Sequence, residues 1–215
     1  SLTAYRALRF GRNVDLLITD QHSYRSEEPT SRDEAGPLNS EDFPGDWMPD
    51  SSAIIVLSNR TGQFGLYRQR LDQDTAELIA TAKDGFGNAR VSPDGQWIVF
   101  YRGTEGSSPE VSATEEAPRD IMRIPITGGA AHLIFKARPL CWILVSRPPS
   151  RICAIAELIG KRLVITAFDP LKGRGGELTH YDIDSNQHWE DWSMDLSPDG
   201  TRIAFTSLRS GHPDI

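Results

Sequence analysis

Short motifs that mark common hydrolytic and nucleotide-binding sites are missing from this sequence. It has no Gly-x-Ser-x-Gly nucleophile turn and no Gly-x-x-x-x-Gly-Lys-Ser/Thr phosphate loop. It also has no apolar run approaching the ~20 residues that a membrane helix needs. The minimal sequence signals for a serine hydrolase, a P-loop nucleotide hydrolase and a membrane-spanning helix are therefore absent.

Basic residues are too few for a nucleic-acid-binding protein. The sequence has 23 Lys and Arg against 30 Asp and Glu, which gives a net charge of −7. Because binding to phosphates needs a concentrated basic surface, this balance argues against a nucleic-acid partner. With 38% hydrophobic and 25% charged residues, the 215-residue chain has the composition of a globular protein with a sizeable core.

What the sequence does contain is an internal repeat centred on a Pro-Asp-Gly turn. Residues 92–95 and 197–200 both read Ser-Pro-Asp-Gly, and each copy precedes a short apolar strand. In such a turn Pro presets φ, Asp accepts a hydrogen bond from the backbone two residues on, and Gly takes the left-handed conformation. The motif therefore predicts a tight connection between two strands.

Two weaker copies of this turn occur at residues 48–51 and 147–150. The positions five and seven residues after the four prolines are apolar in every copy: Ile54 and Val56, Ile98 and Phe100, Cys153 and Ile155, Ile203 and Phe205. A spacing of two residues places each pair on one face of a strand. We therefore predict that this face forms core.

A second repeated unit is an outer hairpin. It occurs at residues 66–79, 121–134 and 163–179, where two apolar strands flank a polar or Gly-rich turn. Each repeat thus supplies about four short strands, the content of one propeller blade. The predicted fold is mainly β, an incomplete β-propeller-like array of four-stranded antiparallel repeats at 47–88, 89–136, 137–180 and, in part, 190–215. Residues 1–46 form an irregular N-terminal segment before the repeats.

The two cysteines, Cys141 and Cys153, are not expected to form a disulfide. If residues 147–150 form the turn, Cys153 lies nearer Leu144 or Val145 than Cys141. We therefore predict two buried free thiols.

The repeats resemble those of TolB and of the N-terminal propellers of prolyl-oligopeptidase-type peptidases. Besides the Pro-Asp-Gly turns, the resemblance is carried by Ser-Asn-Arg-Thr-Gly at residues 58–62 and Ser-Leu-Arg-Ser-Gly at 207–211. It covers about residues 47–215. It implies a bacterial-type propeller scaffold and carries no catalytic residue to this chain.

The N-terminal segment has a different resemblance. An apolar run at residues 14–19 ends in Asp20, and His22 and Arg25 follow. Residues 5–45 resemble a piece of the PhoD-type alkaline phosphatases, which are metal-dependent. The resemblance implies that Arg25 clamps a phosphate and that Asp20 or His22 binds metal or shuttles a proton. The alternative is a strand end with solvated polar residues, because motifs for the family's other ligands are not found. Both resemblances suggest a periplasmic or secreted protein.

Two further groups of residues could form sites. His188, Trp189 and Trp192 lie near a repeat boundary and could bind a ligand, or Trp192 could pack between blades. His180, Asp182 and Asp184 share one strand face, as a metal site requires, but Gln187 replaces the turn glycine of a calcium loop. We interpret this second group as a solvated acidic edge, so no metal site is predicted.

The leading functional hypothesis is a non-enzymatic propeller-type module that binds a protein or small ligand without a cofactor. A partner or a second copy would cover its open blade edges, since natural proteins rarely leave such edges free. One alternative is a metal-dependent phosphoesterase that uses residues 5–45 and a divalent metal or iron. Another is a truncated or composite fragment without activity of its own.

Overall fold

The computed structural model describes residues 4–10, 14–19, 42–73, 75–82, 85–102, 118–183 and 193–205, and every element in it is a β-strand. The strands are β1 (Ala4–Phe10), β2 (Val14–Thr19), β3 (Asp42–Trp47), β4 (Ala53–Ser58), β5 (Gly65–Arg70), β6 (Glu77–Thr81), β7 (Phe86–Val91), β8 (Trp97–Arg102), β9 (Arg119–Pro125), β10 (His132–Ala137), β11 (Cys141–Val145), β12 (Cys153–Ile159), β13 (Arg162–Asp169), β14 (Gly173–Asp182), β15 (Met194–Leu196) and β16 (Ile203–Phe205). The described part of the chain contains no helix of the length and hydropathy needed to cross a membrane.

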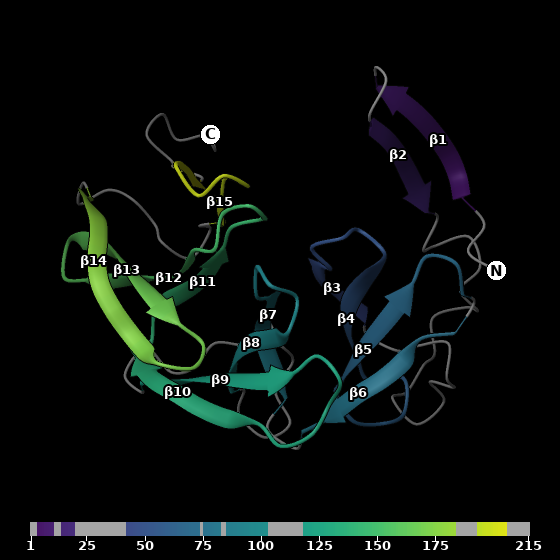
Figure 1. The fold of residues 1–215 in the computed structure, drawn as a ribbon, viewed down its shortest axis with the longest axis horizontal. Helices are drawn as coiled ribbons and strands as arrows, with labels where there is room; N and C mark the ends of the chain where they lie inside the picture. The colour runs from purple at the N-terminus through teal and green to yellow at the C-terminus, as the bar shows by residue number, and fades with distance from the viewer. Residues whose placement is uncertain are drawn as a thin grey trace, which may run out of the picture.

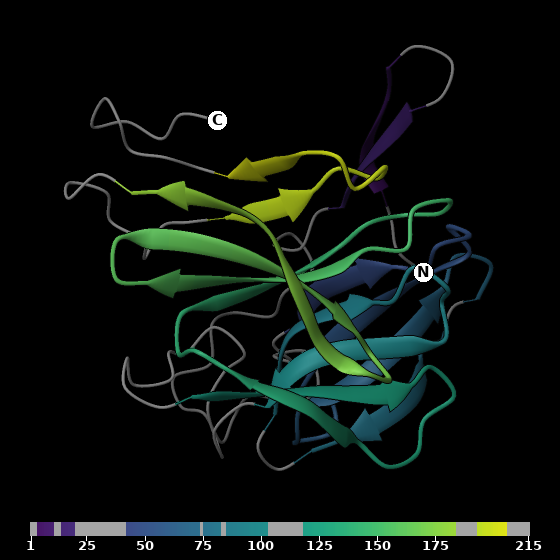
Figure 2. The same ribbon diagram turned by 60° about the vertical axis from the view of Figure 1, so that its left-hand side comes forward.

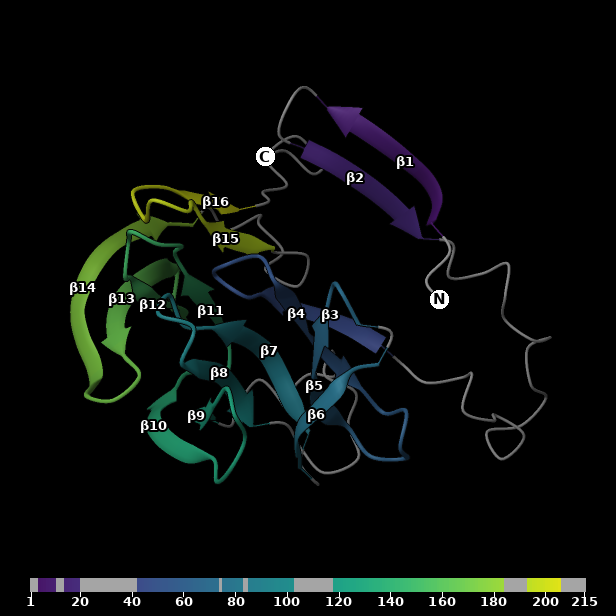
Figure 3. The same ribbon diagram turned by 45° about the vertical axis from the view of Figure 1, so that its right-hand side comes forward.

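The predicted propeller-like array is confirmed. Strands β3 to β6, β7 to β10 and β11 to β14 form three four-stranded antiparallel sheets in simple sequential order, and β15 pairs with β16 in a fourth. Figure 1 shows the three large sheets side by side along an arc, with β3, β7 and β11 on its inner side. Figures 2 and 3 show β15 and β16 stacked against the third sheet. Strands β1 and β2 form a separate hairpin.

The repeat predicts that the first sheet begins at Trp47, but in the structure it begins earlier. Residues 42–47 form its innermost strand, β3, which pairs with β4 through a bulge between Pro44 and Asp46. A Cβ atom on Gly45 would lie 2.8 Å from the carbonyl oxygen of Ile55. Only glycine allows this close approach of two backbones. Because proline and glycine occupy these positions, the strand lacks the alternating apolar residues from which a strand is predicted.

The Pro-Asp-Gly turns have the predicted conformation. Gly95 and Gly200 are left-handed, with φ of 72° and 75°. Asp199 accepts a hydrogen bond from the backbone of Thr201 at 3.0 Å, and Asp94 accepts the equivalent bond from Gln96. Each turn is therefore closed by its own aspartate, as its residue order predicts.

The core consists of three apolar clusters, each lying between two neighbouring sheets. Ile98 and Phe100 pack on the first sheet, Cys153 and Ile155 on the second, and Ile203 and Phe205 on the third. The face predicted from the repeat is therefore the face that each sheet turns toward the sheet before it. We call the packing between the first and second sheets the first junction, and that between the second and third sheets the second junction.

The cysteine prediction is also confirmed. Cys153 pairs with Val145 across β11 and β12, whereas Cys141 lies opposite Glu157. Both thiols are free and buried. Burial raises the pKa of both thiols to about 12, so neither is a reactive thiolate near neutral pH.

Candidate functional site

Several predicted site residues lie outside the described part of the chain. These are the phosphoester candidates Asp20, His22 and Arg25 and the ligand-binding candidates His188, Trp189 and Trp192. Their roles stay predictions. The same holds for the PhoD-type resemblance of residues 5–45.

The carboxylate and histidine on β14 bond to neighbouring side chains. His180 Nδ1 lies 2.8 Å from Glu177, and Arg162 Nε donates to Asp182 at 2.8 Å. This hydrogen bond from Arg162 lowers the pKa of Asp182. Asp184 lies outside the described residues. Among the residues that the structure describes, no group of three His, Cys, Asp or Glu side chains could hold a metal ion.

A buried aspartate connects the sheets near the centre of the arc. The Asp46 carboxylate accepts a hydrogen bond from the backbone N–H of Val91 at 3.0 Å and pairs with the Arg147 guanidinium. Arg147 also donates to the Trp47 carbonyl at 2.9 Å, and its backbone N–H donates to Pro198 at 2.8 Å. These five residues lie in β3 and β7 and in the turns that follow β11 and β15, so this network ties the array together across its centre.

A second buried carboxylate lies at the second junction. Glu157 accepts hydrogen bonds from the Arg174 guanidinium and from the backbone N–H of Arg138. Arg174 also donates to the carbonyl of Lys136 at 3.2 Å and lies over the ring of Phe135, 4.6 Å from its centroid. Arg174 therefore joins β14 of the third sheet to β10 of the second.

Two more arginines strengthen the second junction from β9. Arg119 donates to the carbonyl of Pro139 at 2.6 Å and stacks on Tyr101 at 4.4 Å, and Arg123 donates to the carbonyl of Pro170 at 2.7 Å. Asp46 and Glu157 are the only buried carboxylates among the described residues. Asp46 is bound by Arg147 from the turn that follows β11, so this pair joins the first and third sheets. Glu157 is bound by Arg174 of its own sheet, and Arg174 in turn reaches the second sheet through the Lys136 carbonyl.

One apolar face of the first sheet packs on no core cluster of the described residues. Trp47 lies opposite Ile54, and Val56 lies opposite Tyr67, which in turn lies opposite Leu78. Because paired residues point to the same side of a sheet, all five share one face. Tyr67 is covered by Arg60, whose guanidinium lies 4.7 Å from its ring centroid. We call the other four, Trp47, Ile54, Val56 and Leu78, the first-sheet face.

The first-sheet face is equivalent to faces that are covered elsewhere. Ile98 and Ile155, the repeat equivalents of Ile54 and Val56, are fully buried against the preceding sheet. By contrast, Ile54 and Val56 are only partly buried and Trp47 is 49% exposed. Leu78, at 48%, is as exposed as its repeat equivalents Leu133 and Leu178. No described residue of this chain belongs to a core cluster on this side of the first sheet.

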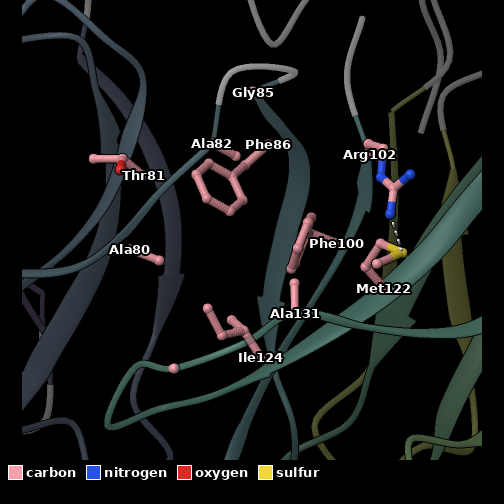
Figure 4. Close-up of a pocket in the computed structure, with 11 residues that line it drawn as sticks. Ala80, Thr81, Ala82, Gly85, Phe86, Phe100, Arg102, Met122, Ile124 and Ala131 are labelled. Atoms are coloured by element: carbon pink, nitrogen blue, oxygen red, sulfur yellow. Dashed lines mark hydrogen bonds between the residues drawn. The ribbon is translucent and has the colours of Figure 1, made fainter.

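A cavity of about 370 Å³ lies at the first junction, between the outer strand β6 and strands β8 and β9. Figure 4 shows the rings of Phe86 and Phe100 and the side chain of Ile124 in its interior, with Arg102 and Met122 together on one side. Small residues, Ala80 among them, leave the space open. Of the described residues that line it, Arg102 is the only charged one.

Comparisons with known proteins show the fold and no family. No family model matches this sequence, and no curated protein matches it. The structure is similar to TolB from Acinetobacter baumannii, with TM-score 0.55 and 19% identity over 80% of this chain and 39% of that chain. It is also similar to a protein assigned as TolB from Agrobacterium tumefaciens, with TM-score 0.53 and 23% identity over 80% of this chain and 55% of that one.

This chain therefore spans 39% and 55% of these two relatives. At such identities the likeness establishes the TolB-like β-propeller fold of the matched part and leaves activity open. A prolyl oligopeptidase B from Galerina marginata also matches, at TM-score 0.36 and 11% identity over 75% of this chain and 29% of that chain.

Proposed function

We propose that this chain is a non-enzymatic, propeller-type interaction module that binds a protein partner through the first-sheet face. The observation that carries the proposal is that Trp47 is exposed, and Ile54 and Val56 are only partly buried, on a face whose equivalents in the other sheets are covered. Exposed apolar side chains gathered on one sheet face are typical of an interaction site.

The repeat also indicates the chemistry of the partner. In this chain, a face of this type is covered by a β-sheet that presents branched side chains, as Ile55, Leu57 and Leu66 do toward the second sheet. Sheets pack face to face at about 10 Å, which requires a flat apolar surface on both sides. The partner therefore presents a β-sheet face with aliphatic residues.

The charged residues support a scaffold rather than a reaction centre. Asp46 pairs with Arg147 across two sheets, the Arg174 partner of Glu157 reaches the second sheet, and both cysteines are buried thiols. The phosphoesterase alternative depends on Asp20, His22 and Arg25, and no interaction of a described residue favours it.

Site-specific photo-cross-linking tests the proposed interface. A photoreactive amino acid replaces Leu78 and, in a matched control, Leu171, which is 60% exposed on the third sheet. We expect one discrete protein adduct from position 78 and none from position 171. Trp47→Ser should remove the adduct, because it removes the largest apolar side chain of the face. Sedimentation of the same samples shows whether the adduct contains a second copy. Equal adducts from both positions would disprove the proposal.

A further inference from the structure

We propose that the cavity at the first junction binds a small amphipathic carboxylate, with its apolar body inside and its carboxylate on Arg102. This site is separate from the first-sheet face and goes beyond the interaction module proposed above. Ala80 lines the cavity, whereas Leu78 lies on the opposite face of β6. The two residues are on opposite faces because the pairing of β5 with β6 shifts register between Leu66 and Tyr67.

The interior of the cavity suits an apolar group. Phe86 and Phe100 meet edge to face, with ring centroids 4.9 Å apart, and both are buried. Ile124 is also buried and Met122 adds an adaptable thioether. A volume of about 370 Å³ falls at the lower end of the range of small-ligand pockets. A short aliphatic chain or a single aromatic ring is therefore the kind of body that fits.

The charge at the cavity selects an anion. Arg102 Nη1 lies 3.5 Å from Asp120 Oδ2, and Lys136 Nζ lies 2.9 Å from Asp120 Oδ1. The Lys136 contact is an ion pair without hydrogen-bond geometry. Two cations thus share one carboxylate, which leaves one positive charge uncompensated in this group. Among the residues that the structure describes, no acidic side chain lines the cavity.

The guanidinium of Arg102 is free to reorient toward a ligand. Its Nη2 donates to the sulfur of Met122 at 3.7 Å, as Figure 4 shows, and sulfur is a weak acceptor. The side chain is 47% exposed, so it can turn without leaving water. A planar guanidinium matches a carboxylate through two parallel hydrogen bonds. One such group favours a monocarboxylate over a multiply charged anion.

Calorimetric titration of the whole chain with octanoate and with 1-octanol tests the site. The two probes have the same chain length and differ in charge. We expect saturable one-to-one binding of octanoate, about tenfold tighter than octanol, because a charge-assisted pair adds to the same apolar contact. Arg102→Gln should remove that preference, and Arg102→Lys should keep part of it.

A pair of neighbouring alanines separates the cavity from other apolar surfaces. Ala131 lines the cavity and is exposed, and Ala130 is equally exposed but does not line it. Ala131→Phe should abolish binding of both probes, whereas Ala130→Phe and Leu78→Ser should leave it unchanged. Equal affinity for octanoate and octanol, an unchanged preference in Arg102→Gln, or retained binding in Ala131→Phe would each overturn the proposal. Absence of binding to the folded wild-type chain would also overturn it.

Discussion

The two junctions between the large sheets join similar repeats by different chemistry. At the second junction, Arg119, Arg123 and Arg174 each donate to a carbonyl at the boundary between the two sheets. At the first junction the contact is mostly apolar, and the cavity of about 370 Å³ lies within it. Arginine hydrogen bonds thus cross the second junction, whereas apolar contacts dominate the first.

The difference shows how a repeat scaffold can acquire a site. The strands, turns and core faces are shared by all sheets, so they set the architecture. The side chains at the outer ends of β6, β9 and β10 are not shared, and at the first junction they line the cavity. Small residues such as Ala80 and Gly129 at the first junction occupy the region where bulky groups would fill the space.

Removal of the buried carboxylate at the second junction should have the largest effect. Glu157→Ala leaves the Arg174 guanidinium and the Arg138 N–H without their acceptor. We expect the free energy of unfolding to fall by about 3 kcal/mol, as for other broken buried pairs. Urea unfolding measures the change. Glu177→Ala, at an exposed carboxylate, should change stability by less than about 0.5 kcal/mol. Equal losses in both variants would show that the second junction does not depend on this charge.

A methyl group at the first junction should have an intermediate effect. Gly128 has φ of +85°, and a Cβ there would lie 2.7 Å from the carbonyl oxygen of Ile79. Gly62 has a similar φ of +88° but no atom within 4 Å of such a Cβ. Gly62→Ala should therefore cost about 1 kcal/mol from backbone strain alone, and Gly128→Ala about 2 kcal/mol or more. Thermal unfolding of the pair compares them. Equal losses of stability in the two variants would show that the backbone at Ile79 moves to accommodate the added methyl group.

Acid should weaken turns at both ends of the array. The Ser197 hydroxyl, followed by the N–H of Thr201, lowers the pKa of Asp199 to about 2, and Ser52 lowers the pKa of Asp50. A lowered pKa in the folded state means that the ionised form adds stability above about pH 4, and that this stability is lost as pH falls toward 2.

The melting temperatures of wild type and Asp199→Ala between pH 7 and pH 2 test this dependence. The variant should melt lower at neutral pH, and the difference should shrink steadily below about pH 4. This is the smallest expected effect, because the turn is exposed to solvent. A difference that stays constant down to pH 2 would contradict it.

Sequence patterns predicted the local features of the sheets well. The spacing after each proline identified the face of Ile98 and Phe100, and the strand register predicted free cysteines; both are confirmed. The strand β3 was not predicted, because Pro44 and Gly45 interrupt the alternation of apolar residues and the strand contains a bulge. The site candidates His188, Trp189 and Trp192 lie outside the described residues and stay predictions.

The sequence by itself determined the turns, the four-strand repeats and the side of each strand that faces core. These follow from the preferred φ of Pro and Gly and from the alternation of side chains along a strand, which act over a few residues. Only the tertiary structure showed that Arg147 reaches Asp46, 101 residues away, that Arg102 borders a cavity, and that Trp47 is half exposed on the first-sheet face. These three features depend on the angle at which successive sheets pack. Many weak contacts along the whole sheets set that angle, and no short sequence pattern encodes them.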